Sequence, residues 1–142
     1  METKIIDSFR NEYAFLSNFF IESDGYSVEH RYQAAKATNQ ADYNYIMESS
    51  TPAIAKKRGR EIAIRDDWHN AKLFVMRELL IKKFRDENLR RKLLETGSSH
   101  LIENNYWNDH FWGICNSIGH NWLGRILMNL RDEYFKDDER EY

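Results

Sequence analysis

Apolar positions along the chain change from strand-like to helix-like spacing after its first quarter. Residues 4–9 and 15–21 are apolar and aromatic runs, and the turn dipeptide Asp24-Gly25 follows the second run. After Ser27, a candidate N-cap, helix formers dominate as far as about Tyr43. The pattern therefore predicts a small N-terminal β-sheet followed by a first helix.

The remaining predicted helices are bounded by residues that favour helix ends. Thr51 followed by Pro52 begins a second helix, because proline suits the first helical position. Gly97 ends a later one, since glycine readily adopts the left-handed conformation found there. The predicted helices after the first span about residues 52–62, 67–84, 88–96 and 122–134, with a candidate strand at 100–103. We expect an α+β fold, mostly helical, as a single compact domain over residues 1–142, with about five helices and a frayed tail at 136–142.

Composition narrows the class of protein. Of the 142 residues, 42% are hydrophobic and 31% are charged, and the net charge is −2. The longest apolar runs are four residues, too short to span a membrane, and the first residues lack the features of a secretory signal. Cys115 is the single cysteine, which excludes an internal disulfide and a multi-thiolate zinc site. We expect a cytoplasmic protein with no membrane partner, no metal and no cofactor.

One polar cluster in the predicted first helix has catalytic potential. Glu29, Gln33 and Lys36 are spaced four and three residues apart, so on a helix they share one face. A carboxylate, an amide and an amine could together perform proton transfer or Schiff-base chemistry if another element covers them. The alternative is an ordinary solvated helix face.

A long loop, residues 104–120, is rich in tryptophan and carboxamide side chains. Loops of this length in compact domains are usually functional or disordered, and the aromatic content argues against disorder. Gly119, just before the candidate cap Asn121, could leave backbone N–H groups directed at an anion such as a phosphate. The alternative is that Asn121 simply begins a helix.

Four cations surround a glycine in the run Lys56-Lys57-Arg58-Gly59-Arg60. Glycine inside a helix costs about 1 kcal/mol relative to alanine, so either the helix ends at Gly59 or another group approaches closely. Arg58 and Arg60 suit the phosphates of a nucleotide. A plain run of surface charge explains them as well.

Six segments along the chain carry recognisable motifs, of which Glu29-His30-x-Tyr32-Gln33-Ala34-x-Lys36 is the most specific. The others are Tyr13 to Phe19; Arg58-Gly59-Arg60 with Asp67-Trp68 and Val75-Met76-Arg77; Leu93 to Gly97; Asn108-Asp109 with Phe111-Trp112-Gly113; and Gly119 to Gly124 with Leu127-Met128 and Arg131. In this order the segments resemble the YbiA-like family, also called the NADAR domain family, of small N-glycosidases.

The resemblance implies cleavage of the C–N bond between a ribose anomeric carbon and an amine or nucleobase. It implies two substrate classes, the phosphoribosylamino-pyrimidine intermediates of early riboflavin synthesis and ADP-ribosylated guanine. The partners implied are thus a small phosphoribosyl or ADP-ribosyl N-glycoside and ADP-ribosylated nucleic acid. By position, the implied catalytic residues are Glu29, Lys36 and Asp109. The implied substrate-binding residues are Asn18, Gln33, Arg58, Arg60, Trp68, Trp112 and Asn121.

Two functions of other classes stay open at this point. One is a non-catalytic module that binds ADP-ribose or an NAD derivative, and the other is an interaction protein with an aromatic face. The combination of Glu29, Lys36 and Asp109 favours an enzyme, because a pure binder needs shape and cations but no paired carboxylate and amine. The route also stays open between direct hydrolysis through an oxocarbenium-like sugar and a Schiff base on Lys36, as does the acid and base assignment of Glu29 and Asp109.

Overall fold

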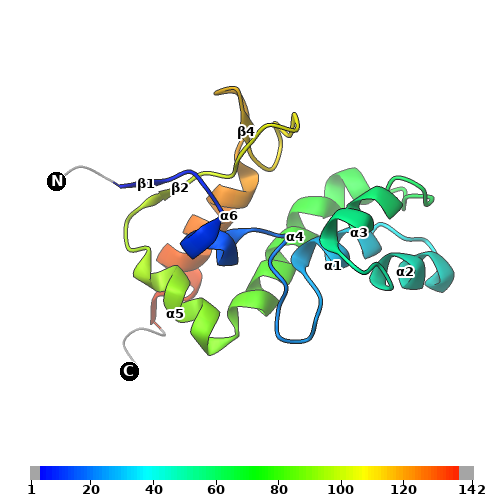
Figure 1. Cartoon of the computed structure of the whole chain (residues 1–142), viewed down its shortest axis with the longest axis horizontal. Helices are drawn as coiled ribbons and strands as arrows, with labels where there is room; N and C mark the ends of the chain where they lie inside the picture. Colours follow the sequence, from blue (N-terminus) through cyan, green and yellow to red (C-terminus); the bar gives the residue numbers. More distant parts are fainter. Residues whose placement is uncertain (1–3, 138–142) are drawn as a thin grey trace. The chain divides into compact units, whose positions relative to one another are not determined.

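The computed structural model describes residues 4–137, which form six α-helices, one 3₁₀-helix, one π-helix and four two-residue strands. The chain divides into two compact units (Figure 1). The helical unit is Asn18–Lys83, and the mixed unit combines residues 4–17 with residues 84–137. The predicted α+β, mostly helical class is confirmed. The predicted single domain over 1–142 includes residues 1–3 and 138–142, which lie outside the described residues, as does most of the predicted tail.

Three short helices pack against one another in the helical unit, and a long fourth follows them along the chain. Their bounds are α1 Val28–Ala34, α2 Gln40–Met47, α3 Pro52–Arg58 and α4 Trp68–Phe84. Ala34, Ile46 and Ala55 form their buried core. Alanine on α1 and on α3 allows the two backbones to approach closely, which positions the side chains described below.

The prediction of one first helix continuous to about Tyr43 is wrong, because two helices, α1 and α2, cover this stretch. The predicted number of five helices was therefore too low. Asn39 accepts a hydrogen bond from the N–H of Asp42 at 2.8 Å, and this cap begins α2 as a separate helix. Asparagine competes with helical backbone pairing in this way, which favours helix starts over helix interiors. Likewise α3 ends at Arg58, short of the predicted Ile62.

The start of α1 is held by a buried polar network, and the predicted N-cap Ser27 is confirmed. Ser27 Oγ accepts the N–H of His30 at 3.1 Å, and His30 Nδ1 accepts the N–H of Ser27 at 3.3 Å. This pairing assigns the ring proton to Nε2, which donates to the carbonyl of Ser49 at 2.9 Å. A histidine thus replaces the usual Glu or Gln of a capping box and ties α1 to the segment between α2 and α3.

The strands of the mixed unit form two parallel pairs. They are β1 Ile5–Ile6 with β2 His100–Leu101, and β3 Asn104–Asn105 with β4 Ile114–Cys115. The prediction of a strand at residues 100–103 is confirmed in part. The prediction of a strand at 15–21 is wrong, because Asn11–Leu16 forms the 3₁₀-helix η1 and its consecutive residues Phe15 and Leu16 are both buried. A strand would bury alternate residues instead.

Capping residues set the helix ends in the mixed unit. The helix α5 covers Glu87–Glu95, and Asp86 Oδ1 accepts the N–H of Leu89 at 3.0 Å at its start. Gly97, with φ +63°, ends this helix as predicted. The last helix, α6 Trp122–Asn129, continues into the π-helix η2 Leu130–Tyr134. Within the described part of the chain, no helix has the length and apolarity needed to cross a bilayer.

Candidate functional site

Glu29 is a buried carboxylate on α1, with only 7% of its surface exposed. Its Oε1 accepts a hydrogen bond from Gln33 Nε2 at 2.8 Å, one helical turn along. Its backbone N–H donates to the carbonyl of Asn18 at 3.0 Å. Backbone and side chain are therefore both held, so the carboxylate has one defined orientation.

Lys36 lies beyond the end of α1, in the turn that follows, and not on the helix face predicted for it. Burial lowers the pKa of its amine below the usual value, and the charges of Arg60, Lys72 and Lys56 lower it further. The carboxylate of Glu29 acts in the opposite direction and raises the pKa of Lys36. A half-buried amine with a lowered pKa is neutral more often at neutral pH, and the neutral form is the nucleophile.

Two aromatic rings surround the amine of Lys36. Its Nζ lies 5.5 Å from the ring centroid of Tyr32 and 6.0 Å from that of Trp68. These two rings pack on each other with centroids 5.0 Å apart, and both side chains are buried. Trp68 begins α4 and Tyr32 belongs to α1, so two helices build this aromatic wall. The wall lies beside the amine whose pKa is lowered by burial.

Asn18 is joined to this cluster through its backbone carbonyl, which accepts the N–H of Glu29. The side-chain Nδ2 of Asn18 lies 3.6 Å from Met76 Sδ. Its Oδ1 is buried and accepts no hydrogen bond from the described residues. A buried acceptor without a donor costs about 1–3 kcal/mol, and a ligand with an N–H or O–H group would recover that cost.

The two predicted phosphate-binding arginines differ in their surroundings. Arg58 donates from Nη1 to the carbonyl of Tyr45 at 2.7 Å, and its guanidinium lies 4.4 Å from the Tyr45 ring centroid. The Tyr45 hydroxyl in turn donates to the carboxylate of Glu61. Arg60 is exposed, and its charge acts on Lys36. Arg58 thus joins α3 to α2, and Arg60 is the arginine brought near the amine.

Asp109 belongs to the mixed unit, where it organises the loop that contains Trp112. Its Oδ1 accepts the backbone N–H groups of Phe111 at 3.0 Å and Trp112 at 2.9 Å. The side-chain amide of Asn105 binds both backbone groups of Asp109. Asn105 Nδ2 donates to the Asp109 carbonyl at 2.9 Å, and Asn105 Oδ1 accepts the Asp109 N–H at 3.1 Å. The ring of Trp112 packs edge-on against Phe111, with centroids 4.8 Å apart.

Asn121 is buried, and its amide joins two segments of the mixed unit. Its Nδ2 donates to the carbonyl of Leu101 at 2.9 Å, and its Oδ1 accepts the N–H of Glu103 at 2.9 Å. It precedes α6 as predicted, but its side chain does not cap the helix, and its own backbone is left-handed with φ +53°.

The predicted anion site at the start of α6 is wrong. The N–H groups of residues 120–123 donate to the carbonyls of His110, Gly113, Phe111 and Trp112 at 2.8–3.2 Å. The loop 104–120 folds back over the helix start and satisfies these donors itself, which leaves none of the four for a phosphate.

Replacing Asn121 with alanine is expected to destabilise the protein by about 2–4 kcal/mol, because two buried backbone groups lose their partners. Urea unfolding followed by circular dichroism measures this loss. The matched control is Asn116→Ala, since Asn116 is also left-handed, with φ +51°, but exposed. Equal losses in the two variants would contradict the bridging role and leave only backbone strain.

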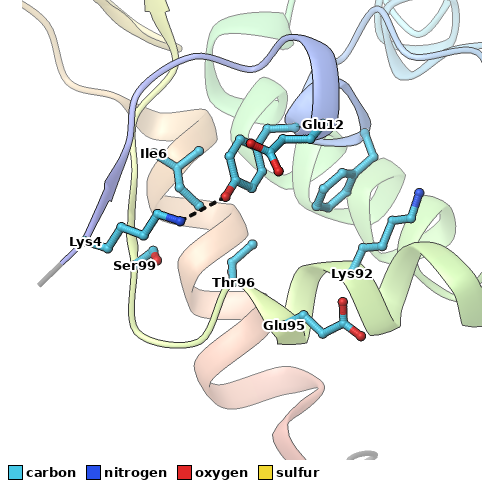
Figure 2. A pocket seen from close by; sticks show the side chains of 9 residues that line it. Lys4, Ile6, Glu12, Lys92, Glu95, Thr96 and Ser99 are labelled. Atoms are coloured by element: carbon cyan, nitrogen blue, oxygen red, sulfur yellow. Dashed lines mark hydrogen bonds between the residues drawn. The ribbon is translucent and has the colours of Figure 1, made fainter.

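The mixed unit also contains an open cavity of about 500 Å³, with no predicted site residue in its lining (Figure 2). Its walls combine lysine, glutamate and hydroxyl groups, and Lys4 Nζ donates to the Tyr13 hydroxyl at 3.2 Å. Opposite charges line it in equal number, Lys4 and Lys92 with Glu12 and Glu95, so the lining favours no single ligand charge.

The structure therefore brings four of the predicted site residues together in the helical unit: Glu29, Gln33, Lys36 and Trp68, with Asn18 and Arg60 beside them. Asp109, Trp112 and Asn121 belong to the mixed unit. The sequence did not identify Lys72, a residue of α4 that belongs to no motif. Its charge lowers the pKa of Lys36. Nor did the sequence identify His30 as a buried structural residue, for which the Ser27-x-x-His30 spacing was the available signal.

Comparison with known proteins identifies the family. The model of the NADAR domain matches residues 8–134. The chain is 40% identical over 114 residues to the N-glycosidase Npun_R5314 of Nostoc punctiforme, covering 75% of this chain and 72% of that protein. It is 34% identical over 145 residues to the N-glycosidase YbiA of Escherichia coli, covering 94% and 90% of the two chains.

A solved structure matches as well. The NMR structure of the E. coli protein YbiA superimposes with a TM-score of 0.84 at 33% identity, over 100% of this chain and 90% of that one. The riboflavin biosynthesis protein VVA0006 of Vibrio vulnificus is 35% identical over 131 residues, which are 85% of this chain but 35% of that protein. By family model, sequence and fold together, the chain belongs to the NADAR domain family.

Proposed function

We propose that this protein hydrolyses the C–N bond between C1 of a phosphoribosyl group and the amine of a pyrimidine. Its family and its relatives make it a hydrolase of N-glycosyl bonds. Relatives from Vibrio vulnificus and Zea mays are named riboflavin biosynthesis proteins. These names favour a phosphoribosylamino-pyrimidine over ADP-ribosylated guanine as the substrate. The single buried cysteine, Cys115, fits a reducing compartment, and we place the activity in the cytoplasm.

The observation that carries the proposal is a half-buried Lys36 amine beside an aromatic wall, on which the charge of the fixed Glu29 carboxylate acts. Burial and neighbouring cations lower the pKa of the amine, while Gln33 fixes the carboxylate that acts on it. A binding module for ADP-ribose would gain nothing from an amine kept partly neutral, because a charged lysine binds phosphate better. A neutral amine next to a fixed carboxylate serves covalent catalysis.

The proposed reaction starts from the ring-opened sugar, in which C1 is joined to the pyrimidine nitrogen as an imine. Lys36 Nζ adds to C1, and the C1–N bond to the pyrimidine breaks while Glu29 carries both Nζ protons to the departing nitrogen. The pyrimidine leaves as a free amine, and the sugar remains as an imine of Lys36. Water then adds to C1, the C1–Nζ bond breaks, and ribose phosphate leaves as its aldehyde.

Asp109 contributes differently in this proposal. One of its oxygens already accepts two backbone N–H groups, which suits a residue that shapes a loop better than one that exchanges protons. We therefore assign proton transfer to Glu29 and assign Asp109 to holding the loop of Trp112. In a direct hydrolysis without Lys36, the same carboxylate, Glu29, would stabilise the oxocarbenium-like sugar.

The test is a mass-spectrometric turnover assay on two substrates, an aminopyrimidine phosphoriboside and an ADP-ribosylated guanine oligonucleotide. We expect release of the aminopyrimidine, and turnover of the oligonucleotide alone would overturn the proposed substrate. Adding borohydride during turnover should reduce the imine and leave a sugar phosphate covalently attached at Lys36.

Lys36→Arg keeps the positive charge but cannot form an imine, so it should lose the adduct and most of the turnover. Lys72→Arg is the matched control, because it keeps the charge through which Lys72 acts on Lys36, and it should retain both. Full activity of Lys36→Arg would exclude the imine route in favour of direct hydrolysis.

A further inference from the structure

Gly59 occupies a position where the backbone itself does not require glycine. It follows the last residue of α3 with φ −61° and ψ −21°, an ordinary right-handed conformation that any residue adopts. Alanine would therefore be the better choice by conformational entropy alone. The reason for glycine must lie in what surrounds this position.

The amide of Gln33 fills the space that a side chain at position 59 would need. A Cβ at Gly59 would lie 2.0 Å from Gln33 Oε1 and 2.7 Å from Gln33 Cδ, far inside contact distance. Both residues are buried, and they belong to α1 and to the end of α3, which pack together. The close approach considered for this glycine in the basic run is therefore made by a glutamine side chain.

The orientation of that amide is set by Glu29. Gln33 Nε2 donates to Glu29 Oε1 at 2.8 Å, so the amide oxygen of Gln33 faces Gly59. This oxygen is buried and accepts no hydrogen bond from the described residues. A buried amide oxygen without a donor destabilises the fold. Gln33 thus donates to the carboxylate while its own oxygen lacks a donor, and a buried unsatisfied group of this kind calls for an explanation such as a catalytic role.

We propose that Gly59 and Gln33 are positioning residues for Glu29: the missing side chain at 59 leaves room for the amide that orients the carboxylate. The inference rests on the proposed function, in which Glu29 transfers protons. It gives Gln33 a role that acts through Glu29, in place of the contact with substrate that the family resemblance implies. A side chain at 59 would push the amide away and free the carboxylate to rotate.

The first measurement is the turnover of Gly59→Ala, with kcat and KM determined separately. We expect kcat to fall by about 10- to 100-fold, since misplacing a catalytic group by about 1 Å costs up to that much. KM should change much less than kcat, because the displaced group acts in the chemical step. A change in KM alone would overturn the proposal.

A double-mutant cycle distinguishes positioning from general damage to packing. Gln33→Ala removes the atoms that a methyl group at position 59 would strike, so Gly59→Ala should add little to the loss already caused by Gln33→Ala. Additive losses would show that Gly59 acts through something other than Gln33. Ala53→Ser is the control, an exposed position on α3 that gains one atom, and it should leave kcat unchanged.

An activity-independent readout keeps this inference separate from the proposed function. In ¹⁵N-labelled protein, the side-chain amide signals of Gln33, assigned from Gln33→Ala, should titrate with Glu29 and should shift in Gly59→Ala. If the wild type turns over neither substrate but these signals behave as expected, the proposed function fails and the positioning stands. If the wild type is active and Gly59→Ala matches it in kcat and in these signals, the positioning fails.

Discussion

Replacing Glu29 with glutamine is expected to reduce kcat/KM by about 10²- to 10⁴-fold, the usual contribution of a positioned acid–base group. Glutamine has the same shape, and its amide oxygen can still accept the hydrogen bond from Gln33 Nε2, so the local structure should persist. What is lost is the ability to carry protons from Lys36 Nζ to the departing pyrimidine nitrogen. Steady-state turnover of the aminopyrimidine phosphoriboside measures the effect.

The matched control for this variant is Glu48→Gln in the same unit. Glu48 is exposed and follows the last residue of α2, where loss of its charge should leave turnover within twofold. Thermal unfolding of both variants should resemble that of the wild type. A Glu29→Gln variant with wild-type turnover would contradict the proposed proton transfer by Glu29.

The second large effect concerns stability and arises from Lys83. This lysine, on the last turn of α4, is 1% exposed, and burial lowers its pKa to about 7. Glu22, whose own pKa burial raises, partly opposes this shift, and the ring centroid of Phe20 lies 5.4 Å from Lys83 Nζ. The folded protein thus releases this proton at a much lower pH than the unfolded chain does.

The sign follows from proton counts. Between about pH 7 and 9 the unfolded chain keeps the Lys83 proton while the folded protein has lost it, so raising the pH favours the folded state. One proton corresponds to about 1.4 kcal/mol per pH unit, and over this window we expect the free energy of unfolding to rise by about 2 kcal/mol. Below pH 6 both states hold the proton, and the full cost of burying the charge remains.

Urea unfolding at several pH values tests this expectation with two neighbouring variants. Lys83→Met should lose the rise between pH 7 and 9 and should exceed the wild type in stability at pH 6, because no charge is then buried. Lys82→Met is the matched control, an exposed lysine on the same turn, and it should keep the wild-type pH dependence. A rise that persists in Lys83→Met would assign it to another group.

The sequence predicted the helix boundaries correctly where a residue at the helix end interacts with the neighbouring backbone. Ser27 and Thr51 cap the helices predicted for them, and Gly97 ends α5 with the expected positive φ. Asp24-Gly25 forms the predicted turn, in which the N–H of Glu22 donates to the carbonyl of Tyr26 at 2.8 Å. Each of these involves residues at most a few positions apart, so the sequence contains the complete interaction.

Other features depended on partners far away in the sequence. The apolar residues near the N-terminus indicated a strand, but Ile5 pairs with His100 in parallel, a partner that no local pattern specifies. The sequence indicated free N–H donors for an anion at the start of α6, but the carbonyls of residues 110–113 accept them. The amide of Asn121 likewise bridges Leu101 and Glu103 instead of capping its helix.

By itself, the sequence determined the family, the fold class and the Glu29–Gln33 pair, since a spacing of four residues on one helix ensures contact. The tertiary structure decided the surroundings of Lys36 and of Gln33. Lys36 lies beyond the helix, and burial together with the charges of Arg60, Lys72 and Lys56 lowers the pKa of its amine. Gly59 is explained only by the glutamine packed against it. Burial and long-range charge arise when distant segments meet, and for that reason a linear pattern cannot specify them.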